Sequence, residues 1–209
     1  MTQRELFTIP NLLTYLRIFL IPFIVAFIFL NTWESLTIAF VLYGLSALTD
    51  TFDGLIARKF NQATEWGAYI DPLADKLLVW AVYGIFCFLP FLHIPWYVVL
   101  PIFLRDLFVT WLRIYAKKHG LSFKTSFIAK AKTTFQMVGI TLIMTFMWIL
   151  KTLARWVYKA PLDYSEVISR LHLPVWIQYL PLLLTILIAL FTLYTGWDYY
   201  KKMSSGGNA

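Results

Sequence analysis

Six apolar stretches, each about 20 residues long, constrain the fold of this chain more than any other feature. They run approximately over residues 12–30, 35–57, 70–90, 96–115, 128–150 and 175–197. A helix of this length spans the hydrocarbon core of a bilayer. Hydrophobic residues make up 60% of the 209 residues and charged residues only 14%, which is more apolar surface than a soluble domain of this size can bury. We therefore predict an all-α, polytopic membrane protein with six transmembrane helices.

The remaining segments are short and polar. Residues 1–10 end at Pro10 and are expected to lie at the membrane interface as an amphipathic segment. Residues 151–174 form a longer amphipathic connection, and the Gly/Ser/Asn-containing residues 201–209 are predicted to be a flexible tail. Because no internal repeat or linker interrupts the chain, we expect residues 1–209 to form a single membrane domain.

The distribution of Lys and Arg predicts the orientation. The turns at 31–34 and 90–95 contain neither residue, whereas the connections on the opposite side and the two end segments hold Arg4, Arg58, Lys59, Lys117, Lys118, Lys124, Lys201 and Lys202. Cytoplasmic loops of membrane proteins carry the excess of these residues, so we expect both termini to face the cytoplasm. Residues 151–174 depart from this pattern. With six spans, this connection lies on the non-cytoplasmic side of the membrane, yet it contains Lys151, Arg155, Lys159 and Arg170. An interfacial helix or a re-entrant segment would explain the exception.

Four aspartates lie near the end of the second apolar stretch and the start of the third: Asp50, Asp53, Asp71 and Asp75. Ionised carboxylates near hydrocarbon are costly, and four together repel one another. The simplest way to neutralise them is to bind one or two divalent cations. Hard oxygen ligands suit Mg²⁺ or Mn²⁺.

The spacing of these residues supports a site. If residues 50–58 are helical, five side chains share one face within about 140° of arc: Asp50, Asp53, Gly54, Ala57 and Arg58. Asp71 and Asp75 are four residues apart, so they stack on a second helix, with Gly67 on the same side if that helix starts early. Two facing helices would then present four carboxylates to one point. The small residues would let a ligand approach the backbone closely.

This order of residues resembles the signature of the CDP-alcohol phosphatidyltransferases. The match runs through Asp50, Asp53-Gly54, Ala57-Arg58, Gly67, Asp71 and Asp75 with no departure in residue or spacing. The resemblance implies that Asp50, Asp53 and Asp71 are metal ligands. It implies that Asp75 also binds metal and deprotonates the attacking hydroxyl. Gly54, Ala57, Arg58 and Gly67 would contact the CDP moiety of the lipid.

The resemblance also implies a reaction and a cellular setting. The phosphatidyl group would pass from CDP-diacylglycerol to an alcohol with release of CMP, assisted by two divalent ions, Mg²⁺ or Mn²⁺. The enzyme would be a homodimer of six-helix subunits among the lipids of the bacterial inner membrane. Its polar cavity would open to the cytoplasm.

A basic cluster near the fourth and fifth apolar stretches points to the acceptor. It comprises Arg105, Arg113, Lys130 and Lys132. Arg105 and Asp106 are well inside an apolar stretch, so their side chains should face the protein interior. Such a cluster suits a phosphate on the acceptor alcohol, since Arg can bind phosphate through two hydrogen bonds.

Three stretches narrow the resemblance to the bacterial phosphatidylglycerophosphate synthases of the family. They are IPNLLTYLRIFLIP at 9–22, DPLADK at 71–76, and the segment from LRDLFVTWLR to KAKTTFQ at 104–136. Members of that group use glycerol 3-phosphate as acceptor. Asp106 departs from the pattern, because a Glu is expected after Arg105, and the shorter side chain changes the reach of the carboxylate.

Two other functions remain open. A transferase of the same family could use phosphatidylglycerol, an inositol phosphate or serine as acceptor, although the basic cluster favours a phosphorylated one. A divalent-cation carrier could also line its path with aspartates. Such a carrier has no need of Arg58 beside its cation site, whereas a nucleotide pyrophosphate has. Nothing in the sequence resembles a nucleic-acid-binding module.

Overall fold

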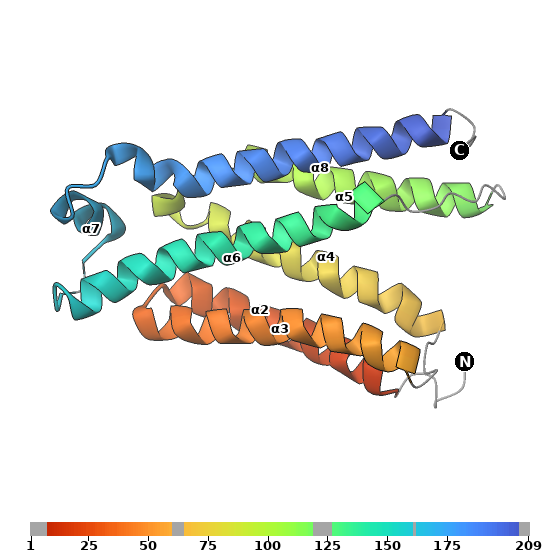
Figure 1. Cartoon of the computed structure of the whole chain (residues 1–209), viewed down its shortest axis with the longest axis horizontal. Coiled ribbons are helices and arrows are strands. Elements are labelled where there is room, and N and C mark those ends of the chain that lie inside the picture. Colours follow the sequence, from red (N-terminus) through yellow and green to blue (C-terminus); the bar gives the residue numbers. More distant parts are fainter. Residues whose placement is uncertain (1–7, 60–64, 119–126, 161, 205–209) are drawn as a thin grey trace. The chain divides into compact units, whose positions relative to one another are not determined.

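The computed structural model describes residues 8–59, 65–118, 127–160 and 162–204, and every regular element in these ranges is helical (Figure 1). The all-α prediction is therefore confirmed for the described residues. In chain order the helices are α2 (Ile9–Leu30), α3 (Trp33–Lys59), α4 (Glu65–Cys87), η1 (Pro90–Leu92), α5 (Trp96–Lys118), α6 (Phe127–Trp156), α7 (Tyr164–Arg170), η2 (Val175–Tyr179) and α8 (Leu180–Ser204).

Each predicted span corresponds to a long helix, but fewer helices qualify as spans by length and composition. Among the described residues, three segments are long and apolar enough to cross a membrane: Ile9–Leu30, Lys132–Trp156 and Val175–Lys201. The apolar part of α3, Trp33–Thr49, is shorter. That the chain crosses the membrane six times remains a prediction.

The turn predicted at 31–34 joins α2 and α3 tightly. Asn31 ends α2 in the left-handed conformation, with φ 51°. Thr32 then caps α3: its hydroxyl accepts the backbone N–H of Ser35 at 3.1 Å, and its own N–H donates to the Ser35 hydroxyl at 3.0 Å. This reciprocal cap satisfies two of the donors left open at a helix start.

The described helices group into two compact units. The first lies within Met1–Ile85 and Met147–Leu162, and the second within Phe86–Phe146 and Asp163–Ala209. In the first unit α2 packs along α3, and buried Ile24, Ile28 and Leu36 contribute to its core. In the second unit α5 packs along α8 (Figure 1). The expectation of a single domain stays a prediction.

The ends and the long connection are more helical than expected. Ile9 and Pro10 already belong to α2, and residues 1–7 lie outside the described residues. Helix α6 continues to Trp156, and α7 begins after Asp163, whose N–H donates to the Glu166 carboxylate at 3.0 Å. Helix α8 continues through Ser204, four residues into the predicted tail. Basic residues near a helix C-terminus, here Lys201 and Lys202, favour this extension.

Candidate functional site

The first half of the aspartate signature lies in the last part of α3. The structure confirms that residues 50–58 are helical. The side chains of Asp50, Asp53, Gly54, Ala57 and Arg58 lie outside the part of the chain that the structure describes. Their predicted common face therefore stays a prediction.

The second half of the signature lies in the first part of α4. Because this helix begins at Glu65, Gly67 falls within its first turn, where the residue is buried. Asp71 and Asp75 follow on successive turns of the same helix, and both are partly buried. The predicted stacking of these two carboxylates on one helix agrees with this register.

Helix α2 supplies the partners of both carboxylates. The Thr14 hydroxyl donates to Oδ1 of Asp71 at 2.6 Å, and the Arg17 guanidinium forms an ion pair with Oδ1 of Asp75. The Arg17 side chain is only 1% exposed, against 26% for Asp75. A buried positive charge next to Asp75 compensates part of the negative charge that the sequence analysis assigned to metal ions alone.

The sequence analysis included Thr14 and Arg17 only as part of a resemblance and gave them no role at the site. A signal was nevertheless present in the spacing. Asn11, Thr14 and Arg17 recur every third residue within an apolar segment, and all three are buried. Polar residues on one face of a membrane helix face the protein interior. The spacing could not reveal that this polar face of α2 contacts α4.

The described carboxylates fit a divalent cation. They provide hard oxygen donors one helical turn apart, and for each a donor from α2 fixes one oxygen. Such outer contacts orient metal ligands in proteins. Within the described residues no group of three or more His, Cys, Asp or Glu side chains forms a complete metal site. The described half of the site therefore offers two candidate ligands, Asp71 and Asp75.

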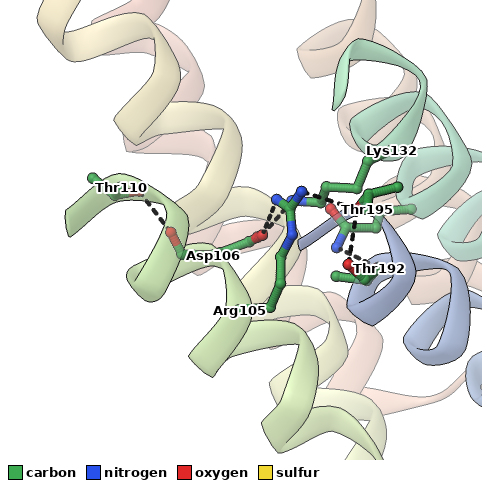
Figure 2. Close-up of polar contacts among 7 residues, drawn as sticks. Arg105, Asp106, Thr110, Lys132, Thr192 and Thr195 are labelled. Carbon is green, nitrogen blue, oxygen red and sulfur yellow. Dashed lines mark hydrogen bonds and ion pairs between the residues drawn. The ribbon is translucent and has the colours of Figure 1, made fainter. Parts of the chain in front are cut away.

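The second unit holds a separate polar cluster, formed by α5, α6 and α8 (Figure 2). Arg105 and Lys132, two residues of the predicted acceptor pocket, meet there at Asp106. Oδ1 of Asp106 lies 2.5 Å from Nζ of Lys132 and 3.3 Å from Nη1 of Arg105. Arg105 also donates from Nη2 to the Thr195 hydroxyl at 2.9 Å. Nearby, Gln136 donates to the Thr192 hydroxyl at 3.3 Å.

The cluster is buried, and this determines its electrostatics. The exposed fractions of Arg105, Asp106 and Lys132 are 8%, 2% and 5%. Two cations share one carboxylate, so these three side chains carry a net positive charge. Oδ2 of Asp106 is buried and has no hydrogen-bond partner among the described residues. A buried group with excess positive charge favours an anionic ligand.

Two predicted members of the acceptor pocket are not placed. The side chains of Arg113 and Lys130 lie outside the described residues, although their backbones belong to α5 and α6. The prediction that Arg105 and Asp106 face the protein interior is confirmed, because both side chains are buried. The structure adds that Asp106 joins Arg105 to Lys132, a role that the sequence does not indicate.

Comparison with known proteins gives a consistent result. A model of the CDP-alcohol phosphatidyltransferase family matches residues 7–162. The CDP-diacylglycerol–glycerol-3-phosphate 3-phosphatidyltransferase of Salmonella choleraesuis (strain SC-B67) is 36% identical over 180 residues, covering 83% of this chain and 93% of that protein. The proteins of the same name from Escherichia coli (strain K12) and Shigella sonnei (strain Ss046) are each 38% identical over 181 residues, with the same coverage. The chain therefore belongs to the CDP-alcohol phosphatidyltransferase family.

Proposed function

We propose that this protein transfers the phosphatidyl group of CDP-diacylglycerol to sn-glycerol 3-phosphate, giving phosphatidylglycerol phosphate and CMP. The main support for this proposal is the similarity, along 83% of the chain, to relatives that are named for this activity. The intact aspartate signature supports the same reaction, because it provides the carboxylates that a metal-dependent phosphoryl transfer requires.

Asp50, Asp53, Asp71 and Asp75 would hold two divalent ions, Mg²⁺ or Mn²⁺. The oxygen donors of Asp71 and Asp75, and their support by Thr14 and Arg17, are consistent with this assignment. When bound, the ions would supply positive charge for the pyrophosphate of the lipid donor and for the leaving CMP.

Asp75 would also accept a proton, and the remaining signature residues would bind the lipid donor. Asp75 would take the proton from the attacking hydroxyl of the acceptor, with Arg17 fixing the orientation of the carboxylate. Gly54, Ala57 and Gly67 would let the CDP moiety approach the helix backbones, and Arg58 would bind its phosphates.

The phosphate of glycerol 3-phosphate would bind to Arg105, Arg113, Lys130 and Lys132. The buried excess of positive charge around Asp106 supports this choice of a phosphorylated acceptor. In the absence of acceptor, Asp106 would hold Arg105 and Lys132 together and limit their mutual repulsion.

The setting of the reaction is the bacterial inner membrane. The three long apolar helices support integral membrane insertion. The distribution of Lys and Arg in the connections favours an active site facing the cytoplasm, where CDP-linked precursors and glycerol 3-phosphate would bind. We further propose that the enzyme functions as a homodimer.

The variant Asp75→Asn tests the proposed chemistry. It removes the proton acceptor while keeping the shape of the side chain, so Mg²⁺-dependent CMP release should fall at least about a hundredfold. Asp163→Asn is the matched control, since Asp163 precedes α7 and Asn is an equally good helix N-cap. Full turnover by Asp75→Asn would contradict the assignment.

A further inference from the structure

A second basic pocket lies at the other end of the α2–α3 hairpin from the aspartates. Its cavity has a volume of about 550 Å³ and is lined by residues 31–34 and by residues from the end of α6 and the segment after it, among them Lys151, Arg155 and Lys159. Along α3, Glu34 and Asp50 are separated by about 24 Å of helix rise. The pocket is therefore distinct from the proposed catalytic site.

The lining of this pocket is positively charged. Three basic side chains, Lys151, Arg155 and Lys159, face one carboxylate, Glu34. Arg155 forms an ion pair with Glu34, and its guanidinium carbon lies 4.8 Å from the centre of the Trp33 ring. Three basic side chains against one carboxylate give the lining a formal net positive charge. The pocket thus suits an anion.

The backbone fixes the position of this charge. Lys159, three residues after the end of α6, adopts the left-handed conformation, with φ 50°. The next residue closes the helix end, because the N–H of Ala160 donates to the carbonyl of Ala154 at 3.3 Å. The Trp33 indole N–H donates to the Thr152 hydroxyl at 3.0 Å, which ties the start of α3 to the same end of α6.

The pocket also lies where a lipid headgroup would be. Two of the three segments that can cross a membrane, Ile9–Leu30 and Lys132–Trp156, end at its rim. Trp33 and Trp156 flank it, with ring centres 6.1 Å apart in an edge-to-face arrangement. Tryptophan is enriched at the level of lipid headgroups. Basic pockets between membrane helices bind anionic headgroups.

We propose that this pocket binds the phosphate-bearing headgroup of an anionic phospholipid, at the membrane face opposite the aspartates. The proposal accounts for Lys151, Arg155 and Lys159, three of the four basic residues in 151–174 that the positive-inside pattern leaves unexplained on that side. It does not depend on the transferase activity, and a protein inactive in CMP release would still be expected to bind.

Lipid titration of the full-length protein in detergent tests this proposal. The probes are phosphatidylglycerol and phosphatidylcholine with the same acyl chains, and native mass spectrometry measures the dissociation constant of the first bound lipid. We expect the wild type to prefer phosphatidylglycerol. In Lys151→Gln/Lys159→Gln the affinity for phosphatidylglycerol should fall about thirtyfold, from the contribution of each basic residue near an anionic headgroup. The Arg155–Glu34 pair remains in this variant.

The control variant Lys201→Gln/Arg170→Gln removes the same charge elsewhere and should keep the wild-type affinity. An unchanged affinity in the Lys151/Lys159 variant, or equal binding of phosphatidylcholine by the wild type, would overturn the proposal. If the double variant does not fold, as judged by its unfolding temperature, the exposed Lys159→Gln substitution alone should still weaken binding.

A competition experiment with inorganic phosphate distinguishes a lipid ligand from a soluble anion. Inorganic phosphate at millimolar concentration should leave the bound phosphatidylglycerol in place, because it lacks the acyl chains that hold the lipid in the membrane-facing part of the pocket. Displacement of the lipid by inorganic phosphate, with binding still dependent on Lys151 and Lys159, would assign the pocket to a soluble anion. That result would overturn the lipid proposal.

Discussion

At the scale of single residues, Thr14 and Arg17 matter as much as the carboxylates that they contact. Arg17 is almost completely buried, and its guanidinium forms an ion pair with Asp75. Removing one member of a buried ion pair typically costs about 3–5 kcal/mol, because the other charge is left without compensation. The same pair orients a predicted metal ligand. Loss of Arg17 should therefore impair both folding and activity, which makes Thr14 the cleaner residue to test.

Thr14→Val removes the hydroxyl that donates to Asp71 and keeps the volume of the side chain. Loss of such an outer contact usually weakens metal affinity about 10–100-fold. We expect the Mg²⁺ concentration for half-maximal CMP release to rise at least about tenfold. Thr141→Val is the control, since the Thr141 hydroxyl donates only within its own helix, to the Met137 carbonyl at 2.9 Å. An unchanged Mg²⁺ dependence in Thr14→Val would remove Thr14 from the site.

At the scale of elements, the contact of α5 with α8 positions the proposed acceptor cluster. Gly196 of α8 lies against Arg105 so closely that a Cβ atom there would be 2.8 Å from Cγ of Arg105. Cγ is near the backbone, so the Arg105 side chain cannot avoid this contact without changing its conformation. The absence of a side chain at residue 196 thus allows Arg105 to reach Asp106 and Thr195.

Gly196→Ala should therefore displace Arg105 and raise the KM for glycerol 3-phosphate several-fold, with a smaller change in kcat. Overpacking of this kind also costs about 1–3 kcal/mol of stability. Gly84→Ala is the matched control, because a Cβ at residue 84 meets no atom within 4 Å. Steady-state kinetics of both variants check this prediction. Equal KM values in the two would contradict the role of the α5–α8 contact.

The helices themselves were largely predictable, since apolar stretches of about 20 residues specify membrane-type helices. The ends of the helices were less predictable from the sequence. They depend on local hydrogen bonds and charges rather than on hydropathy, as in the Thr32–Ser35 cap and the extension of α8. The spacing of Asp71 and Asp75 correctly predicted that both residues belong to one helix, α4. The roles of Arg17 and Asp106 could not be predicted, because they depend on which helix packs against which.

At the scale of the whole molecule, the account requires a definite orientation. The turn containing Thr32 should lie outside the cytoplasm, and the end of α8 inside. In a Cys87→Ser background, Thr32→Cys should react with a membrane-impermeant maleimide on intact spheroplasts. Lys201→Cys, also exposed, should react only after permeabilisation. Labelling of Thr32→Cys only after permeabilisation would reverse the orientation.

The most direct test of the proposed transferase activity is a CMP-release assay on the purified protein in detergent. It uses CDP-diacylglycerol, Mg²⁺ or Mn²⁺, and four acceptors in turn: glycerol 3-phosphate, inositol phosphate, phosphatidylglycerol and serine. The account predicts release with glycerol 3-phosphate alone. Release with a different acceptor would keep the aspartate chemistry and contradict the acceptor pocket. No release with any acceptor, from folded protein that binds divalent metal, would contradict the transferase activity itself.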